Sequence, residues 1–338
     1  MFFPVAGIEV NPLLPPLVAL VVSYFCSMAG ISGSFLLLPF QVSGLGYTAP
    51  SVSATNQFFN IIATPGGIYR YLREGRMLWP LAAVLLLGTF PGVFIGALIR
   101  VTCLTEVSRF KLFVALVLVY IGYRLTVSLF AGRSGKNPGS AGSTGDSSDS
   151  CNLGTQESSA CANGLNEPDN STAPKSAAQN CGPMRLKITN ARLTPTSISY
   201  DFGGDSFSVP TRKIFLISLA IGTVGGVYGV GGGSMITPVL VSLCSLPIYT
   251  ITAASLLATF GTSVFGVLFF LLLSGFFPER AIAPDFLLGL LFGLGGLAGM
   301  YLGARTQKFI PAHYIKWGMV LVIFATAAKY LIDFATDF

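Results

Sequence analysis

The sequence predicts an all-α polytopic membrane protein in which one unit is written twice. The chain has 338 residues, of which 52% are hydrophobic and only 10% are charged, and its mean hydropathy is +0.70. Apolar runs of about 18 residues or more, long enough to cross a bilayer, recur along most of it. The second half also aligns with the first, without a gap, at an offset of about 199 positions. At this offset Gly33 meets Gly232 and Pro39 meets Pro238, and such a period indicates an internal duplication.

Each copy has a glycine break inside a long apolar stretch near its start. In the second copy the break contains Gly231, Gly232 and Gly233, and the first copy has Ser32-Gly33-Ser34 in the matching place. Exposed backbone cannot face lipid. A break at membrane depth must therefore be buried in protein or line a wet cavity.

Four apolar spans are predicted in each copy, together with the broken half-helix. They are residues 12–29, 50–69, 78–99 and 110–130 in the first copy, and 214–229, 250–273, 283–303 and 312–332 in the second. The total is eight spans at minimum. The third span of each copy has a glycine at every fourth position, at Gly88, Gly92, Gly96, Gly295, Gly299 and Gly303. This spacing favours close contact between helices in lipid.

A soluble insertion at residues 131–210 separates membrane repeat 1 (residues 1–130) from membrane repeat 2 (residues 211–338). Up to about Cys181 it is rich in Ser, Gly, Asn and Ala, which is typical of a flexible linker. Two alternating runs then flank Gly203-Gly204 and predict a β-hairpin. Because a lone hairpin is marginal in water, we expect it to pair with residues 186–193 or to lean on the membrane domain.

The candidate anion site combines the backbone of the two breaks with the polar side chains of the second span in each copy. Free N–H groups at the start of a half-helix can bind an anion without a charged side chain, and polar groups inside a span often mark a pathway. The candidate substrate-binding residues are Ser32, Gly33, Ser34, Thr55, Asn56, Gln57, Asn60, Gly231, Gly232, Gly233, Ser234, Ser255 and Thr259. Thr262 and Ser263 are weaker candidates. The alternative, purely structural roles are tight packing at the glycines and interhelical hydrogen bonds at the polar residues.

Arg100 and Arg305 close the glycine-faced spans, where they could steer anions at the entry or anchor the helix ends at lipid head groups. The net charge of +6 does not imply nucleic acid, because the basic residues lie at span ends and can set orientation there. The spans hold no pair of carboxylates and no histidine cluster. We therefore expect no enzyme, no cofactor and no metal site.

The Gly-Gly-Gly-x-x-x-x-Pro break that ends at Pro238, the run from Leu246 to Ser263 and the duplication together resemble the sulfite exporter TauE/SafE family. The resemblance implies a secondary transporter that moves sulfite or an organosulfonate across the bacterial inner membrane, most simply as an exporter. Two alternatives remain: an uptake permease of the same family, and a receptor or scaffold that docks partners through the insertion. A coupling ion and homo-oligomerisation stay open.

The sequence also leaves open whether the two copies are parallel or inverted. If the broken segment makes a single crossing, the copies are parallel, whereas a second crossing would invert them. Lys and Arg counts do not separate the two models. Inverted repeats suit alternating access around a midplane site, and both models place the insertion in the cytoplasm.

Overall fold

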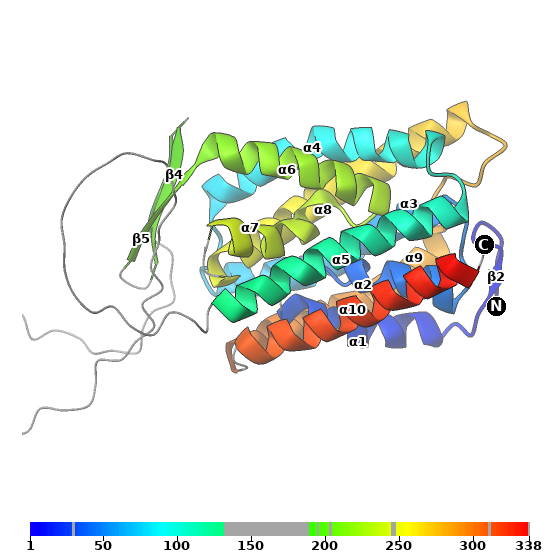
Figure 1. Ribbon diagram of the computed structural model, residues 1–338, viewed down its shortest axis with the longest axis horizontal. Helices are drawn as coiled ribbons and strands as arrows, with labels where there is room; N and C mark the ends of the chain where they lie inside the picture. Colours follow the sequence, from blue (N-terminus) through cyan, green and yellow to red (C-terminus); the bar gives the residue numbers. More distant parts are fainter. Residues whose placement is uncertain are drawn as a thin grey trace, which may run out of the picture.

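The computed structural model describes residues 1–28, 31–131, 189–194, 196–202, 205–244, 248–309 and 312–336. Most of these residues are helical (Figure 1). The predicted flexible linker and the Gly203-Gly204 turn lie outside the described residues.

Both halves of the chain contain a broken pair of short helices followed by three long helices. The first half has α1 (Leu14–Met28), α2 (Ser34–Pro39) with the π-helical turn η1 (Phe40–Gly44), α3 (Ser51–Arg73), α4 (Trp79–Thr102) and α5 (Val107–Ala131). The second has α6 (Thr211–Tyr228), the 3-10 turn η2 (Gly232–Met235), α7 (Ile236–Cys244), α8 (Ile248–Phe276), α9 (Phe286–Thr306), the turn η3 (Gln307–Phe309) and α10 (Ala312–Thr336). The matching order is what a duplication predicts, although order alone does not establish one.

The two broken pairs enter the helical bundle from opposite ends (Figure 1). α1 follows the N-terminus on the right of the view, whereas α6 follows the strands on the left. After the second break the chain turns back: the axis of the segment Gly232–Val241 is bent by 118° from that of α6. Entry from opposite ends is the geometry of inverted repeats, so the helix directions favour the inverted arrangement that the sequence left open.

Three of the described helices are long and apolar enough to cross a membrane: α4, most of α8 (Thr250–Phe276) and α9. The bent pair of α6 and η2–α7 could count as a fourth. α3 has sufficient length, with 23 residues, but it carries the polar run around Asn56 and Asn60. Several apolar helices agree with a multi-pass membrane protein, whereas the total of eight spans stays a prediction.

The glycine faces hold two helix pairs together, α4 with α6 and α9 with α1. A Cβ added to Gly92 would overlap the carbonyl of Leu219 and come within 2.7 Å of the backbone nitrogen of Thr223. A Cβ added to Gly299 would overlap the carbonyl of Leu20 in the same way. The prediction of close helix–helix contact at these glycines is therefore confirmed, and each glycine-faced helix packs on the first helix of the other half.

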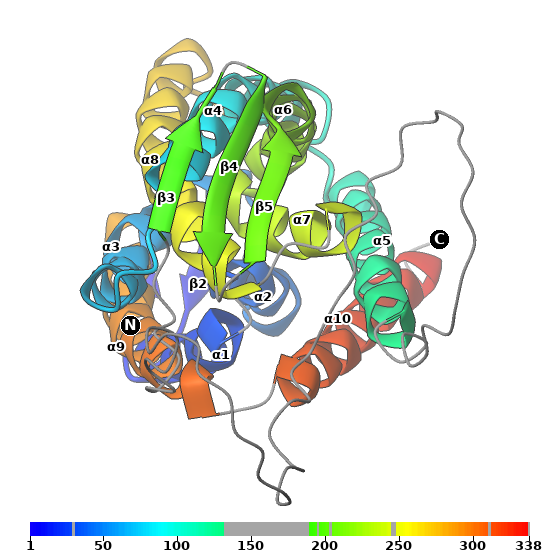
Figure 2. The same cartoon turned by 90° about the vertical axis from the view of Figure 1, so that its left-hand side faces the viewer.

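A three-stranded antiparallel sheet covers the end of the bundle where α6 begins (Figure 2). It consists of β3 (Thr189–Leu193), β4 (Ser197–Phe202) and β5 (Asp205–Pro210) in that order. The predicted pair of strands is therefore present and gains the third strand expected near residues 186–193. Ile198 and Val209 are buried in a hydrophobic cluster with residues of α4, α7 and α8, so the sheet also leans on the helices.

A small hairpin, β1 (Phe2–Phe3) and β2 (Ile8–Glu9), lies against the opposite end. Phe3 is fully buried in the main hydrophobic core. The backbone N–H of Ala6 donates to Asp285 Oδ2 at 3.3 Å, which ties the hairpin to the start of α9. The sequence did not predict this element, because strands of two residues have no detectable alternation. Each half thus begins with a β element at the end of the bundle where its first helix enters.

Candidate functional site

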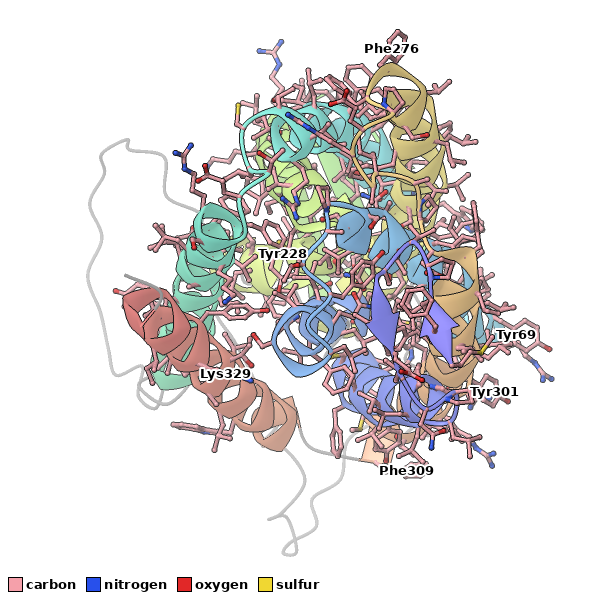
Figure 3. The ribbon with its side chains drawn as sticks, turned by 90° about the vertical axis from the view of Figure 1, so that its right-hand side faces the viewer. Tyr69, Tyr228, Phe276, Tyr301, Phe309 and Lys329 are labelled. Carbon is pink, nitrogen blue, oxygen red and sulfur yellow. The ribbon has the colours of Figure 1, made fainter. Side chains whose placement is uncertain are left out.

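The two breaks meet in the interior of the bundle between α3 and α8. Tyr228, the last residue of α6, points into this interior, whereas Tyr69, Phe276 and Phe309 lie on the outside (Figure 3). The Tyr228 hydroxyl donates to the carbonyl of Phe35 in α2 at 2.9 Å, and the two rings stack with centroids 5.9 Å apart. The helix that precedes the second break is therefore joined to the helix that follows the first.

The carbonyl of Val230 is the main acceptor at this junction. It accepts from Asn60 Nδ2 of α3 at 2.8 Å, from Ser234 Oγ at 3.1 Å and from Ser34 Oγ at 3.4 Å. The hydroxyl of Ser32 donates to Asn60 Oδ1. All four of these polar side chains are fully buried. The structure therefore brings together four of the predicted site residues, from both halves of the chain.

The amide of Asn56 extends this cluster along α3. Its Nδ2 donates to the carbonyl of Ser34 at 3.0 Å. Thr55, by contrast, lies in a different environment: its Oγ1 is 2.9 Å from the Tyr47 hydroxyl and accepts from the backbone N–H of Asp285 at 2.9 Å. Thr55 therefore ties α3 to the start of α9 and is not part of the central cluster. Its helical neighbour Asn56 faces the break because successive helical residues point about 100° apart.

The predicted site glycines allow the breaks to pack against neighbouring helices. A Cβ on Gly232 would come within 2.6 Å of the Thr89 Cβ of α4, and one on Gly233 would overlap the carbonyl of Ser255 in α8. A Cβ on Gly33 would overlap the Ser23 hydroxyl of α1. Gly231 has a φ of +74°, which a residue with a side chain rarely adopts. Tight packing, which the sequence offered as the alternative at these positions, therefore accounts for the glycines whether or not they also bind an anion.

On α8 the two predicted site residues have their hydroxyls occupied. The oxygens of Ser255 and Thr237 lie 2.5 Å apart, and Ser255 Oγ also donates to the carbonyl of Thr252 at 3.2 Å. Thr259 Oγ1 donates to the carbonyl of Ser255 at 2.9 Å. The carbonyl of Ser255 and the side chain of Thr259 lie against Gly233. They hold the second break in place, and a ligand would have to compete for their hydroxyls.

Besides the Oδ1 of Asn56, two polar side chains in the seam between α3 and α8 have no hydrogen-bond partner among the described residues. They are the amide of Gln57, at both its nitrogen and its oxygen, and the hydroxyl of Ser263. Both side chains are fully buried. Gln57 occupies the space left by the missing side chain of Gly266, and Ser263 Oγ lies 2.8 Å from where a Gly231 Cβ would be. Because Ser263 and Gly266 are three residues apart on α8, they share one helix face.

An unpaired polar group in a protein interior costs about 1–3 kcal/mol, so such groups call for an explanation. Ser263 was only a weak candidate from the sequence, and its unpaired hydroxyl makes it a stronger one. Gln41 of η1 was missed entirely: it is fully buried, and neither atom of its amide has a partner among the described residues. A lone glutamine within the apolar stretch of α2 and η1 was the signal that could have identified it.

The two predicted steering arginines have different surroundings. Arg305 lies in the last turn of α9 and is exposed. Arg100 is only 1% exposed. Its Nη1 donates to the carbonyl of Leu104, its Nε donates to Ser53 Oγ at 3.4 Å, and its guanidinium lies 3.7 Å from the centroid of the Phe110 ring. Only Arg305 can therefore attract ions from solution in this conformation. Arg100 is neither an exposed entry residue nor a head-group anchor.

Comparison with known proteins gives a family match over nearly the whole chain. The family described as Sulfite exporter TauE/SafE matches residues 16–330. A protein of Bacillus subtilis (strain 168) named "Probable membrane transporter protein YdhB" is 30% identical over 112 residues. That alignment covers 32% of this chain and 42% of the relative, so the chain matches less than half of the relative's length. No solved structure matches the chain.

Proposed function

This chain belongs to the sulfite exporter TauE/SafE family, and we propose that it is a secondary transporter that exports sulfite or an organosulfonate. The family makes it a multi-pass membrane transporter rather than an enzyme. The choice of anion and the outward direction are our proposal. An uptake permease would have the same site, since direction follows the gradients and the coupling.

The observation that supports an anion site most directly is the pair of unpaired groups, the Gln57 amide and the Ser263 hydroxyl. Both can donate hydrogen bonds to an oxyanion. Ser263 lies beside Gly231 of the second break, and Gln57 packs against Gly266, three residues further along α8. The cluster of Ser32, Ser34 and Asn60 is the adjacent wall. We propose that the anion binds in this seam, with the backbone after Gly231 as a further donor. In the first break the N–H groups of Ser34 and Phe35 already donate to Ser32. Thr259 and Ser255 then support the site from α8.

Uncharged hydrogen-bond donors suit a transport site, because the bound anion must also be released. Hydrogen bonds to a charged group contribute about 1.5–3 kcal/mol each, so a few of them hold an anion without the strength of a buried ion pair. The buried Arg100 is held by the carbonyl of Leu104, the hydroxyl of Ser53 and an aromatic ring near the end of α4. We propose that it stabilises that end of the bundle and lends the seam a positive potential.

The site is closed on both sides in this structure, because its side chains are fully buried. The N-terminal hairpin lies over one end and the β3–β5 sheet over the other. Each is tied to the helices by a specific contact: Ala6 to Asp285 at 3.3 Å, and the hydroxyls of Tyr200 and Thr250 at 3.1 Å. We propose that this is an occluded state and that transport requires the two ends to open in turn.

The docking-module alternative has less support than the transporter. The sheet buries Ile198, Tyr200 and Val209 against the helices, so its apolar face is already used within the chain. A receptor that bound partners through this face would first have to detach it.

The substitution Gln57→Leu tests the site. It replaces an unpaired buried amide with an apolar group of similar size, which is nearly neutral or stabilising for the empty protein. Sulfite binding should nevertheless weaken about tenfold to a hundredfold if one hydrogen bond to the anion is lost. The measurement is the midpoint of thermal unfolding of purified protein with and without sulfite, sulfate and a sulfonate, followed by flux in proteoliposomes.

Gln307→Leu is the matched control. Gln307 is also a buried glutamine, but its amide is satisfied by the carbonyl of Met28 at 2.8 Å and by the hydroxyl of Tyr71 at 3.0 Å. This variant should lower the unfolding temperature and leave the affinity per folded molecule unchanged. Wild-type sulfite affinity in Gln57→Leu would rule out the seam as the binding site.

A further inference from the structure

A groove of about 500 Å³ lies between α5, α6 and α7, away from the α3–α8 seam. Its walls are almost entirely apolar, with Phe113 and Val117 from α5, Ile221 and Val224 from α6, and Val239 from α7. Leu116 and Tyr120 on the same walls are 59% and 53% exposed, so the groove opens to the outside. Its volume is typical of a ligand pocket, roughly 300–1,000 Å³.

One basic residue continues the groove along α6. Lys213 is exposed and lies four residues before Ile217, which lines the groove. Ile221 and Val224 follow after four and three more residues, so all four residues share one face of the helix. The salt bridges found among the described residues do not include Lys213. A positive charge therefore stands at one end of an apolar groove.

The length of this face matches one leaflet of a bilayer. Eleven residues separate Lys213 from Val224, which is about 16 Å of helix. Half of the hydrocarbon core of a membrane is about 15 Å. A lipid whose acyl chain lies beside Val224 would then have its head group near Lys213. Lys213 follows the insertion, which we expect to be cytoplasmic, and the cytoplasmic leaflet carries the anionic lipids.

We propose that this groove binds one anionic phospholipid, with an acyl chain between α5 and α6 and the head-group phosphate at Lys213. A single cation at the end of an apolar groove complements an amphiphile with one anionic head. The inner wall includes Met235 of η2. The bound chain therefore contacts the residue that follows the second break and holds α5 against α7. The proposal does not depend on which anion the protein transports.

The experiment is mass spectrometry of the full chain, purified in detergent and stripped of lipid, after addition of phosphatidylglycerol or phosphatidylcholine. The wild type should retain one molecule of phosphatidylglycerol in preference to phosphatidylcholine. Lys213→Glu should reduce that retention about fivefold to tenfold, because an attractive charge becomes repulsive. Arg212→Glu is the matched control. Arg212 is also exposed in the first turn of α6 but is not on the groove face, so this variant should retain phosphatidylglycerol nearly as well as the wild type.

A second pair of variants tests the groove itself. Ala220→Trp fills it and should reduce retention of both lipids, whereas Leu216→Trp, at a residue that is 63% exposed and does not line the groove, should not. Equal losses in Lys213→Glu and Arg212→Glu would reduce the effect to general surface charge and overturn the proposal. A dimer that disappears in Ala220→Trp, without any lipid adduct in the wild type, would assign the groove to a second copy instead.

Discussion

Asn60 of α3 donates its side-chain amide to the carbonyl of Val230 at 2.8 Å, which ties the polar helix of the first half to the break of the second. The same amide accepts from Ser32 in the first break. One side chain thus contacts both breaks, although Asn60 and Val230 are 170 residues apart in the sequence.

Asn60→Leu should destabilise the protein by about 1–3 kcal/mol, because it leaves buried partners without their hydrogen bonds. The measurement is the thermal unfolding midpoint in detergent. Thr306→Val is the control, since Thr306 bonds only to carbonyls of its own helix. An unfolding midpoint in Asn60→Leu equal to that of the wild type would mean that the junction does not hold the two breaks together.

Gly233→Val should lower the amount of folded protein about as much as Gly92→Val does. Added methyl groups at either glycine would overlap a backbone carbonyl, of Ser255 or of Leu219, and overpacking of this kind costs about 1–3 kcal/mol or more. Size-exclusion profiles of the two variants make the comparison. As a candidate binding residue Gly233 invites this substitution as a test of anion binding, but the packing shows that it is first a test of folding. If Gly233→Val folds normally but loses sulfite affinity, binding of the anion by the backbone N–H groups of the second break gains direct support.

The class of a mostly helical membrane protein could be predicted because hydropathy is averaged over long segments, whereas the 199-residue duplication stays a prediction. The glycine faces could be recognised as contact surfaces, but spacing does not name a partner, and the pairing of α4 with α6 and α1 with α9 came only with the structure. For the site, Asn60 and Asn56 stand out as amides inside a span. A hydroxyl in a helix can donate to the carbonyl four residues earlier, as that of Thr259 does, or turn away from it, so the difference between Thr259 and Ser263 was not predictable. Gln41 was missed because a single glutamine in an apolar run makes no periodic pattern; only its presence inside that run marks it.

Arg305→Gln and Arg100→Gln should have different effects. Arg305 is exposed, so its removal should slow sulfite uptake by proteoliposomes at low ionic strength and have little effect at about 0.15 M salt, where surface charges are screened beyond about 8 Å. Arg100 is buried among its partners, so its removal should lower the thermal unfolding midpoint at any salt concentration. Initial rates and unfolding midpoints at two salt concentrations check both expectations. A salt-dependent rate defect in Arg100→Gln would contradict its assignment as a residue that stabilises the bundle.

We predict that the two halves are inverted, and cysteine labelling tests this prediction. Ser140 in the insertion and Asp337 at the C-terminus lie outside the described residues, but α6 begins at one end of the bundle and α10 ends at the other (Figure 1). A membrane-impermeant thiol reagent should therefore reach Ser140→Cys and Asp337→Cys from opposite faces of the membrane. The background variant replaces all six native cysteines, three of which lie in the insertion with Ser140. Labelling of both positions from one face would restore the parallel arrangement.

Ser263→Ala and Thr262→Val form a matched pair at adjacent residues of α8. Thr262 Oγ1 donates to the carbonyl of Ala258 at 2.8 Å, within its own helix, whereas Ser263 Oγ has no partner among the described residues. Removing the unpaired hydroxyl should leave the unfolding midpoint unchanged or raise it slightly, because a buried unsatisfied group is lost. If that hydroxyl donates to the anion, sulfite affinity should fall about tenfold or more in Ser263→Ala and stay near wild type in Thr262→Val. Binding to purified variants, normalised to folded protein, makes the comparison. Equal affinities in the two variants would remove Ser263 from the site. The unpaired amide of Gln57 would then be the one unpaired donor in the seam that still supports an anion site there.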